Sequence, residues 1–170
     1  MNKELRKKLQ KITPIKFNKI CYRAVDRKYG DPLSTNGSEK FSGRWHIKGE
    51  IRALYMCESE TVCIEELKRK VDDELIIKNR FNVNKLEVNV SKVLDLTSKK
   101  NLNTLDIKEE ELLSGIVQEP DEVKLPNTIA KLAYEAGFEG ILVKSATLAG
   151  NNIILFPENI TKESMIRVII

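Results

Sequence analysis

Apolar and polar residues alternate at 86–90, which predicts a half-buried strand, and the mostly apolar run at 20–25 predicts another strand. Residues 20–25 and 86–90 each place every second side chain on the same side. Short apolar runs predict further strands at residues 53–57, 93–96, 140–143, 152–156 and 165–170. Strands dominate over helices and occur in runs, so we predict an α+β fold, a mixed and mostly antiparallel sheet core with flanking helices.

Apolar residues at helical spacing predict helices in the first half of the chain. Residues 2–11 alternate leucines with lysines, which indicates a short helix or a basic tail at the periphery of the core. Ser59 is a good N-cap for a second helix. The buried side of that helix would consist of Cys63, Ile64, Leu67 and Val71.

The second half offers one clear helix and one poorly patterned region. Asn127 would cap a helix that ends at Gly137. Residues 98–125 are polar and weakly periodic, with one helical pattern at 107–113, and residues 30–43 have the composition of a long loop. No repeat or linker divides the chain, so we expect one domain over residues 1–170, with residues 1–15 peripheral to it.

Composition and charge narrow the class of protein. With 170 residues, 41% of them hydrophobic and 32% charged, the chain has material for one good core. The net charge of +4 is spread along the sequence, which argues against direct nucleic-acid binding but suits a pocket for a small polyanion. The apolar runs are too short to span a membrane and the N-terminus lacks a signal core, so we expect a cytoplasmic protein.

Metal-binding chemistry has little support in the sequence. Cys21, Cys57 and Cys63 form no CxxC pair, and His46 is the only histidine, so we expect no metal site. The cysteines lie in apolar surroundings and are most simply core thiols in a reducing compartment.

Two arginines are candidates for binding phosphate groups. Arg23 lies on an otherwise apolar strand face, where a charge needs a partner or an anionic ligand. Arg44 stands between Gly43, which permits close approach of the backbone, and Trp45, which is a core or platform residue. The alternative is that both arginines are solvated or form structural ion pairs.

Two adjacent carboxylates, Glu65 and Glu66, follow on the helix capped by Ser59. Both could form i,i+4 pairs, with Arg69 and Lys70 respectively, and then belong to a solvated helix face. Neither points into the apolar stripe, so periodicity does not choose between them.

A serine nucleophile has weak support. Ser145 follows an apolar run at a strand end, where a hydroxyl commonly caps a turn. The chain has no GxSxG elbow, no Walker loop and no GxGxxG motif.

Taken in order, these short motifs resemble the RES domain family, whose members include toxins of bacterial toxin–antitoxin pairs. The matching segments are Tyr22-Arg23, Gly43-Arg44-Trp45, Leu54-Tyr55, the helix with Glu65 and Glu66, and residues 140–145 with Asn152 and Phe156 beyond them. His46 stands where the family has asparagine. Counting from Tyr55 without a gap places the family glutamate on Glu66, whereas a one-residue gap would select Glu65.

The resemblance implies an ADP-ribosyltransferase-like fold and an enzyme that breaks the nicotinamide–ribose bond of NAD by hydrolysis or phosphorolysis. It implies no prosthetic group, NAD as substrate and inorganic phosphate as a candidate co-substrate. A helix-turn-helix antitoxin would be the protein partner, and a homo-oligomer stays open. The alternatives are an ADP-ribosyltransferase acting on a macromolecule and a non-catalytic nucleotide-binding or partner-binding module.

The resemblance also implies roles for individual residues. Arg23 and Arg44 would bind the pyrophosphate or an acceptor phosphate, and Tyr55 would stack on or position the ribose. Glu66, or else Glu65, would act at the ribose, and Ser145 would donate a hydrogen bond. The remaining binding residues would be Trp45, His46 and Asn152.

Overall fold

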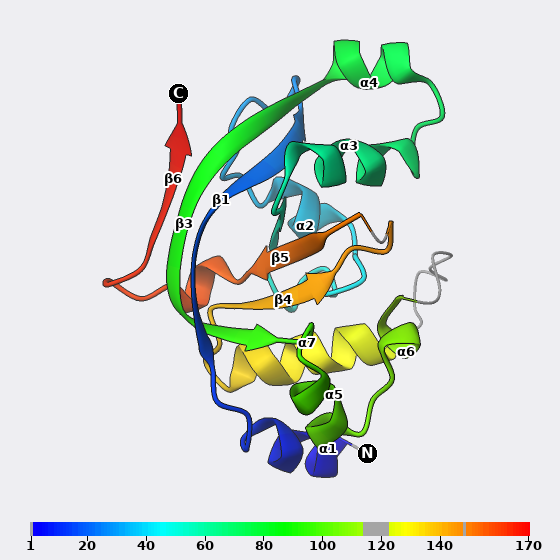
Figure 1. Ribbon diagram of the computed structural model, residues 1–170. Helices are drawn as coiled ribbons and strands as arrows, with labels where there is room; N and C mark the ends of the chain where they lie inside the picture. The colour runs from blue at the N-terminus through cyan, green and yellow to red at the C-terminus, as the bar shows by residue number, and fades with distance from the viewer. Residues whose placement is uncertain (1, 114–122, 148) are drawn as a thin grey trace.

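A curved six-stranded sheet with helices gathered at its two ends makes up the protein (Figure 1). The computed structural model describes residues 2–113, 123–147 and 149–170. The strands are β1 (Ile15–Asp26), β2 (Leu54–Cys57), β3 (Phe81–Asp95), β4 (Gly140–Lys144), β5 (Asn151–Leu155) and β6 (Met165–Ile169). The helices are α1 (Asn2–Leu9), α2 (Asn36–Lys40), α3 (Glu60–Lys68), α4 (Glu74–Arg80), α5 (Lys99–Leu105), α6 (Glu109–Leu113) and α7 (Leu125–Glu135), with a 3-10 turn η1 at Pro157–Asn159.

Five of the six strands pair in a closed order. The sheet order is β1-β2-β5-β4-β3-β6, and β1 also pairs with β3, so the first five strands curve round on themselves. Only β3 and β4 are parallel, and the other five pairings are antiparallel. The predicted α+β fold with a mixed, mostly antiparallel sheet is confirmed.

One long strand, β3, replaces the two strands predicted at 86–90 and 93–96. Its pairing with β1 shifts register at the point where Val90 and Val93 face β1, so β3 carries a bulge there. The backbone N–H groups of Ser91 and Lys92 at the bulge both donate to the buried carboxylate of Glu139, each over 2.8 Å. The carboxylate thus accepts hydrogen bonds from N–H groups that do not pair with the neighbouring strand at the bulge. The strand β3 can therefore bend there without ending.

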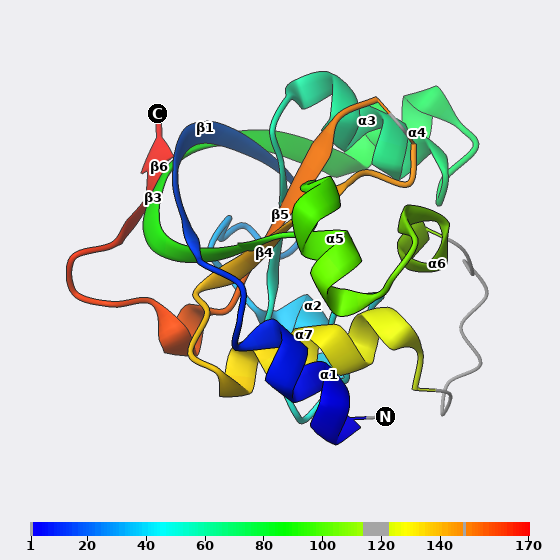
Figure 2. The same ribbon diagram turned by 60° about the horizontal axis from the view of Figure 1, so that its bottom comes forward.

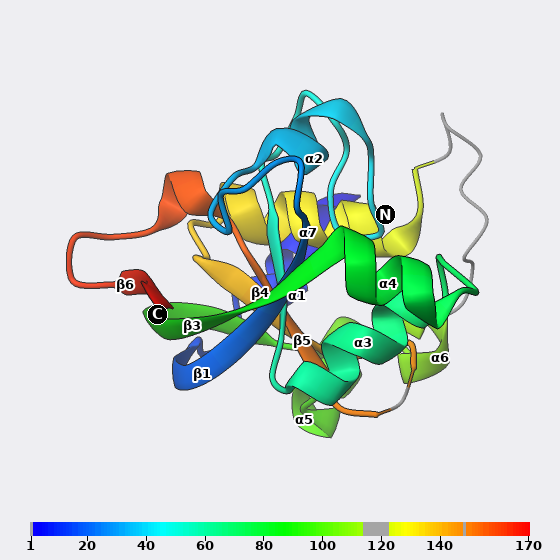
Figure 3. The ribbon, with the colours of Figure 1, turned by 90° about the horizontal axis from the view of Figure 1, so that it is seen from above.

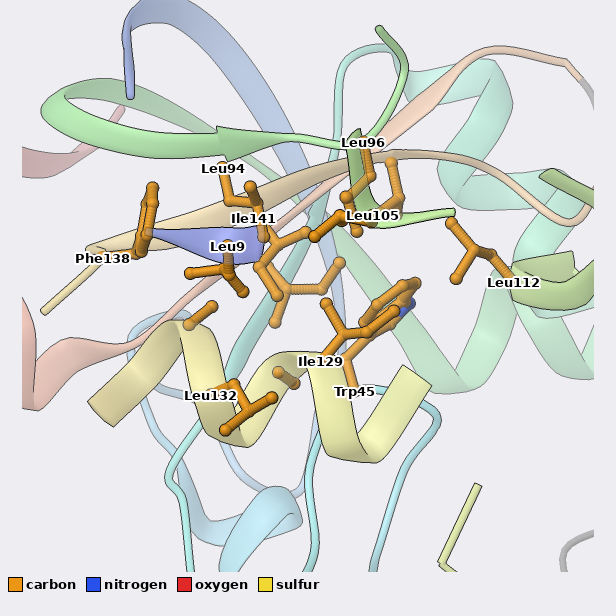
Figure 4. Close-up of a cluster of buried hydrophobic side chains, with 14 of the residues drawn as sticks. Leu9, Trp45, Leu94, Leu96, Leu105, Leu112, Ile129, Leu132, Phe138 and Ile141 are labelled. Atoms are coloured by element: carbon orange, nitrogen blue, oxygen red, sulfur yellow. The ribbon is translucent and has the colours of Figure 1, made fainter. Parts of the chain in front are cut away.

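The largest apolar cluster fills the space between the sheet and the helices α1, α5 and α7 (Figure 4). Helix α1 lies beside α5 and α7 (Figure 2) and buries Leu5 and Leu9, the latter only 1% exposed. The expectation that residues 1–15 lie outside the core is therefore wrong for this helix. Its apolar stripe is short, but its two leucines point to the same side, which is enough to fix the helix against the core.

Several short helices were not predicted from the sequence. Helix α2 lies within the predicted loop at 30–43, and α4 and α5 lie in segments too polar and too short for a clear period. Each of the latter two begins at a side-chain cap, Asp73 accepting from Leu75 N over 2.8 Å and Ser98 accepting from Asn101 N over 3.4 Å. Helix α6 matches the pattern expected at 107–113.

Of the two predicted N-caps, the structure confirms one and not the other. Ser59 caps α3 as expected, accepting a hydrogen bond from Val62 N. The buried residues of α3 are Val62 and Cys63, while the remaining predicted side chains, at 64, 67 and 71, are half-buried. Asn127 is not the N-cap of α7, because the helix already begins at Leu125.

The helices at the two ends of the sheet determine where the candidate site lies. Helix α3 lies against β1 and β2, and α4 follows it at the same end of the sheet (Figure 3). Helix α6 contacts α7 at the other end. Within the described ranges, no helix is long and apolar enough to cross a membrane.

Candidate functional site

A cavity of about 500 Å³ opens between the loop that follows α2, the helices α3 and α6, and the ends of β4 and β5. This volume falls in the range of small-ligand sites. The predicted site residues that line it are Arg23, Arg44, Trp45, His46, Tyr55, Glu66 and Asn152. Residues separated by up to 129 positions in the sequence thus meet in one wall, whereas Glu65 and Ser145 do not line the cavity.

The structure separates the two adjacent glutamates. Glu66 lines the cavity and its side chain is 26% exposed. Glu65 points away from it and pairs with Lys68 over 3.2 Å, with 41% of its side chain exposed. The predicted i,i+4 pairs are wrong, because both glutamates pair with a residue three positions on, Glu66 with Arg69 over 3.9 Å.

The carboxylate of Glu66 is held through one of its two oxygens. Ser145 Oγ donates to Glu66 Oε1 over 2.5 Å, and Asn152 Nδ2 donates to the same oxygen over 3.0 Å. Ser145 follows the end of β4, is fully buried and does not line the cavity. Among the described residues, the other oxygen, Oε2, has only the distant Arg69 contact, which leaves it available to a ligand.

Asn152 has a further property. Its Oδ1 is a buried acceptor without a hydrogen-bond partner in the described part of the chain. Such an atom is costly to bury, by about 1–3 kcal/mol. The orientation of the amide is nevertheless fixed, because the Nδ2 group must face the carboxylate of Glu66.

The two arginines are anchored by backbone carbonyl groups. Arg23 donates to Pro32 O, and to Ser34 O over 2.9 Å, while Arg44 donates to Leu112 O over 2.7 Å. Burial lowers the pKa of both guanidinium groups, and the charge of Arg69 lowers that of Arg44 further. Arginine remains charged despite such shifts, so each side chain presents a fixed cation with spare N–H donors.

His46 and Tyr55 form a hydrogen-bonded pair in the wall of the cavity. His46 Nε2 lies 2.7 Å from Phe41 O, which can only accept, so this nitrogen carries the proton. His46 Nδ1 is then the acceptor for the Tyr55 hydroxyl at 2.8 Å, and Trp45 N donates to the same hydroxyl over 3.0 Å. Burial lowers the pKa of His46 and raises that of Tyr55, which favours the neutral form of both rings.

Gly43 makes room for this pair, and it also lines the cavity. A Cβ at Gly43 would lie 2.6 Å from His46 Cε1 and 2.7 Å from the Tyr55 hydroxyl. The structure thus gives this glycine a packing reason in addition to the expected close approach of its backbone to a ligand. Trp45 is likewise mainly a core residue, 4% exposed and beside Ile129 of α7 (Figure 4), although it borders the cavity.

Asn127, which the sequence suggested only as a helix cap, also supports the site. Its Nδ2 donates to Gly43 O, Arg44 O and His46 O at 2.8 Å, 3.0 Å and 3.3 Å, and its Oδ1 accepts from Lys124 N. It therefore ties the first turn of α7 to the turn at 43–46. Only the tertiary fold brings these segments together, so no local pattern could have revealed the role.

The charges that line the cavity were only partly expected. Arg69, Lys70, Lys144 and Glu109 join the predicted residues. Lys144 pairs with Glu109 over 2.9 Å. Within the described residues, Arg23, Arg44 and Lys70 have no carboxylate at ion-pair distance, so the cavity carries an excess of positive charge.

The cysteines lie apart from this chemistry. All three are buried free thiols, as expected for core residues, and burial raises the pKa of Cys21 to about 12. Across residues 2–113, 123–147 and 149–170, no three His, Cys, Asp or Glu side chains group closely enough to hold a metal ion.

Comparisons with known proteins give a consistent result. The RES domain family matches residues 20–169. The chain is 23% identical over 137 residues to the NAD(+) phosphorylase MbcT of Mycobacterium tuberculosis strain H37Rv and to that of Mycobacterium bovis, covering 78% of this chain and 70% of each relative. It also resembles the solved M. tuberculosis MbcT–MbcA toxin–antitoxin complex, with a TM-score of 0.78 and 19% identity over 98% of this chain and 90% of that one, which shows a shared fold.

Proposed function

The chain belongs to the RES domain family, and from this premise we propose that it degrades NAD as a phosphorylase. It releases nicotinamide and transfers ADP-ribose to inorganic phosphate. The observation that carries the proposal is the side chain of Glu66, which lines a cavity rich in cations and is held through its Oε1 by Ser145 and Asn152.

Glu66 acts at the ribose that bears nicotinamide. Cleavage of the glycosidic bond sends its electron pair to the pyridinium nitrogen, so nicotinamide leaves as a neutral molecule and positive charge develops on the ribose. A fixed carboxylate beside that ribose stabilises the developing charge or holds a ribose hydroxyl group. Because its position is set before the reaction, little reorganisation is needed in the transition state.

The excess positive charge supports phosphate as the acceptor. NAD brings two phosphate groups and inorganic phosphate brings a third, and Arg23, Arg44 and Lys70 are three cations without a carboxylate at ion-pair distance in the described residues. An oxygen of hydrogen phosphate attacks C1 of the ribose as nicotinamide departs. The products are ADP-ribose 1″-phosphate and nicotinamide, and the phosphate keeps its own proton.

We also propose a protein partner and a location. The solved relative is a toxin in complex with an antitoxin, and unrestrained loss of NAD would harm the cell that makes this enzyme. A separately encoded helix-turn-helix antitoxin therefore binds the chain and suppresses its activity in the cytoplasm, where NAD is available.

The decisive experiment incubates purified protein with NAD while phosphate is titrated, and follows nicotinamide release and the sugar product. Wild-type protein is expected to form ADP-ribose 1″-phosphate at a rate that rises with phosphate. Glu66→Gln should lower kcat by about 100-fold or more.

Glu65→Gln is the matched control, because it makes the same chemical change one residue away, outside the cavity. It should retain nearly full activity. Free ADP-ribose formed independently of phosphate would indicate hydrolysis, and label appearing on protein or nucleic acid would indicate a transferase. No loss of NAD under any of these conditions, or equal activity in both variants, would refute the proposal.

A further inference from the structure

Phe41 is an exposed aromatic side chain at the edge of the cavity. It lines the cavity, yet 69% of the residue is accessible to solvent. No aromatic or cation–π contact to its ring is found among the described residues. A large apolar ring left open beside a polar site is a surface that a ligand can cover.

The main chain of Phe41 is fixed even though its ring is open. Its N–H donates to Gly37 O over 3.0 Å at the end of α2, and its carbonyl accepts from His46 Nε2 over 2.7 Å. His46 is held in turn by Tyr55. The buried His46–Tyr55 pair thus positions the backbone that presents the ring.

The other aromatic groups of the cavity are less open to solvent than Phe41. Trp45 is buried in the core, His46 is buried, and the half-buried Tyr55 ring makes a T-shaped contact with His46 at 5.5 Å between centroids. Tyr29, also exposed, lies outside the cavity lining and already has lysine ammonium groups over its ring. Phe41 is therefore the described aromatic side chain best placed to stack on a ligand.

We propose that Phe41 is a stacking platform for a planar heteroaromatic ring of the substrate, and so a residue that sets affinity for the nucleotide. This inference rests on the proposed function, because NAD has two such rings, nicotinamide and adenine. The anchored cations bind the phosphates, which leaves the rings to be held by stacking, and Phe41 supplies the face for one of them.

The test measures binding rather than turnover. In a Glu66→Gln background, NAD, nicotinamide mononucleotide and AMP are titrated onto the full chain by calorimetry, with Phe41 intact or changed to Ala, Leu or Tyr. Phe41→Ala should weaken NAD binding by about 5- to 100-fold. Phe41→Tyr should restore affinity, and Phe41→Leu should not, because it keeps apolar area but loses the aromatic face.

Two comparisons locate the stacked ring and check specificity. If Phe41→Ala weakens nicotinamide mononucleotide but not AMP, the ring is nicotinamide, and the reverse identifies adenine. Tyr29→Ala, an exposed aromatic outside the cavity, should leave all three affinities unchanged. Unchanged NAD affinity in Phe41→Ala, or equal affinity in Phe41→Leu and wild type, would overturn the inference. Because calorimetry measures binding, its result does not depend on whether NAD cleavage is detected, and the two proposals can fail separately.

Discussion

Ser145 provides the sharpest test of how the site is built, because it is fully buried and reaches the cavity only through Glu66. Ser145→Ala removes the hydroxyl that donates to Glu66 Oε1 over 2.5 Å. Asn152 still donates to that oxygen over 3.0 Å, so the carboxylate keeps one of its two anchors. We therefore expect a weakened catalyst with an intact binding site.

The size of the effect follows from the type of bond. A hydrogen bond to a charged group contributes about 1.5–3 kcal/mol. Because the second anchor remains, we expect a loss of about 1.5–2.5 kcal/mol of transition-state stabilisation, which lowers kcat by about 10- to 70-fold. KM for NAD should change little, since Ser145 does not line the cavity.

The assay is steady-state nicotinamide release at saturating phosphate, combined with a double-mutant cycle. In a Glu66→Gln background, Ser145→Ala should have almost no further effect on kcat, because the partner that it positions is already impaired. Thr147→Val is the matched control. It removes a hydroxyl 2.7 Å from Ser145 Oγ while leaving the bond to Glu66 in place, and should keep kcat within a few-fold of wild type.

Three results would refute this reasoning: an unchanged kcat in Ser145→Ala, a change confined to KM, or fully additive losses in the double variant. Thermal denaturation of each variant separates loss of activity from loss of folded protein.

Other features of the fold give further predictions. Hydrogen bonds hold the pKa of Glu139 at about 2 despite its burial, below the ordinary 4.5, so its stabilisation is fully present above pH 4.5 and is lost as pH falls toward 2. Glu139→Gln should lower the free energy of unfolding by about 2 kcal/mol at neutral pH. Urea denaturation at acidic pH should show a smaller difference between the variant and wild type, because wild type loses the same stabilisation there. Gly43→Ala should disrupt the imidazole–phenol pair beside it, lowering activity and reducing stability by about 1–3 kcal/mol. Gly37→Ala, whose added Cβ meets nothing within 4 Å, should not reduce stability. Leu9→Ala should cost about 2–5 kcal/mol in denaturant titrations, against nearly nothing for Lys7→Ala on the exposed side of α1, and equal stabilities would show that α1 does not belong to the core.

The sequence determined the parts of this protein that depend on local pattern. Alternation at 86–90 and the apolar runs at 140–143 and 152–156 predicted strands that the structure contains, and Ser59 predicted the start of α3. These signals work because a strand buries every second residue and a helix leaves its first N–H groups to be capped. The order of short motifs also indicated the family, since each motif keeps its place along the chain.

What the sequence left open concerned contacts between distant segments. The bulge of β3 needs the carboxylate of Glu139, which lies 48 and 47 residues beyond the backbone groups that it binds. The burial of α1 depends on α5 and α7. No pattern within either segment contains this information, so one long strand was predicted as two and a core helix as peripheral.

The choice between Glu65 and Glu66 shows the same division most clearly. Both are glutamates on one helix, both can form ion pairs, and neither lies in the apolar stripe, so their local chemistry is equivalent. The distinction arises because the ends of β4 and β5 bring Ser145 and Asn152 to one side of α3, where their donors meet Glu66 alone. The sequence by itself determined that an acid is carried on this helix, and only the tertiary structure decided which acid faces the cavity, because the donors that fix it come from 79 and 86 residues away.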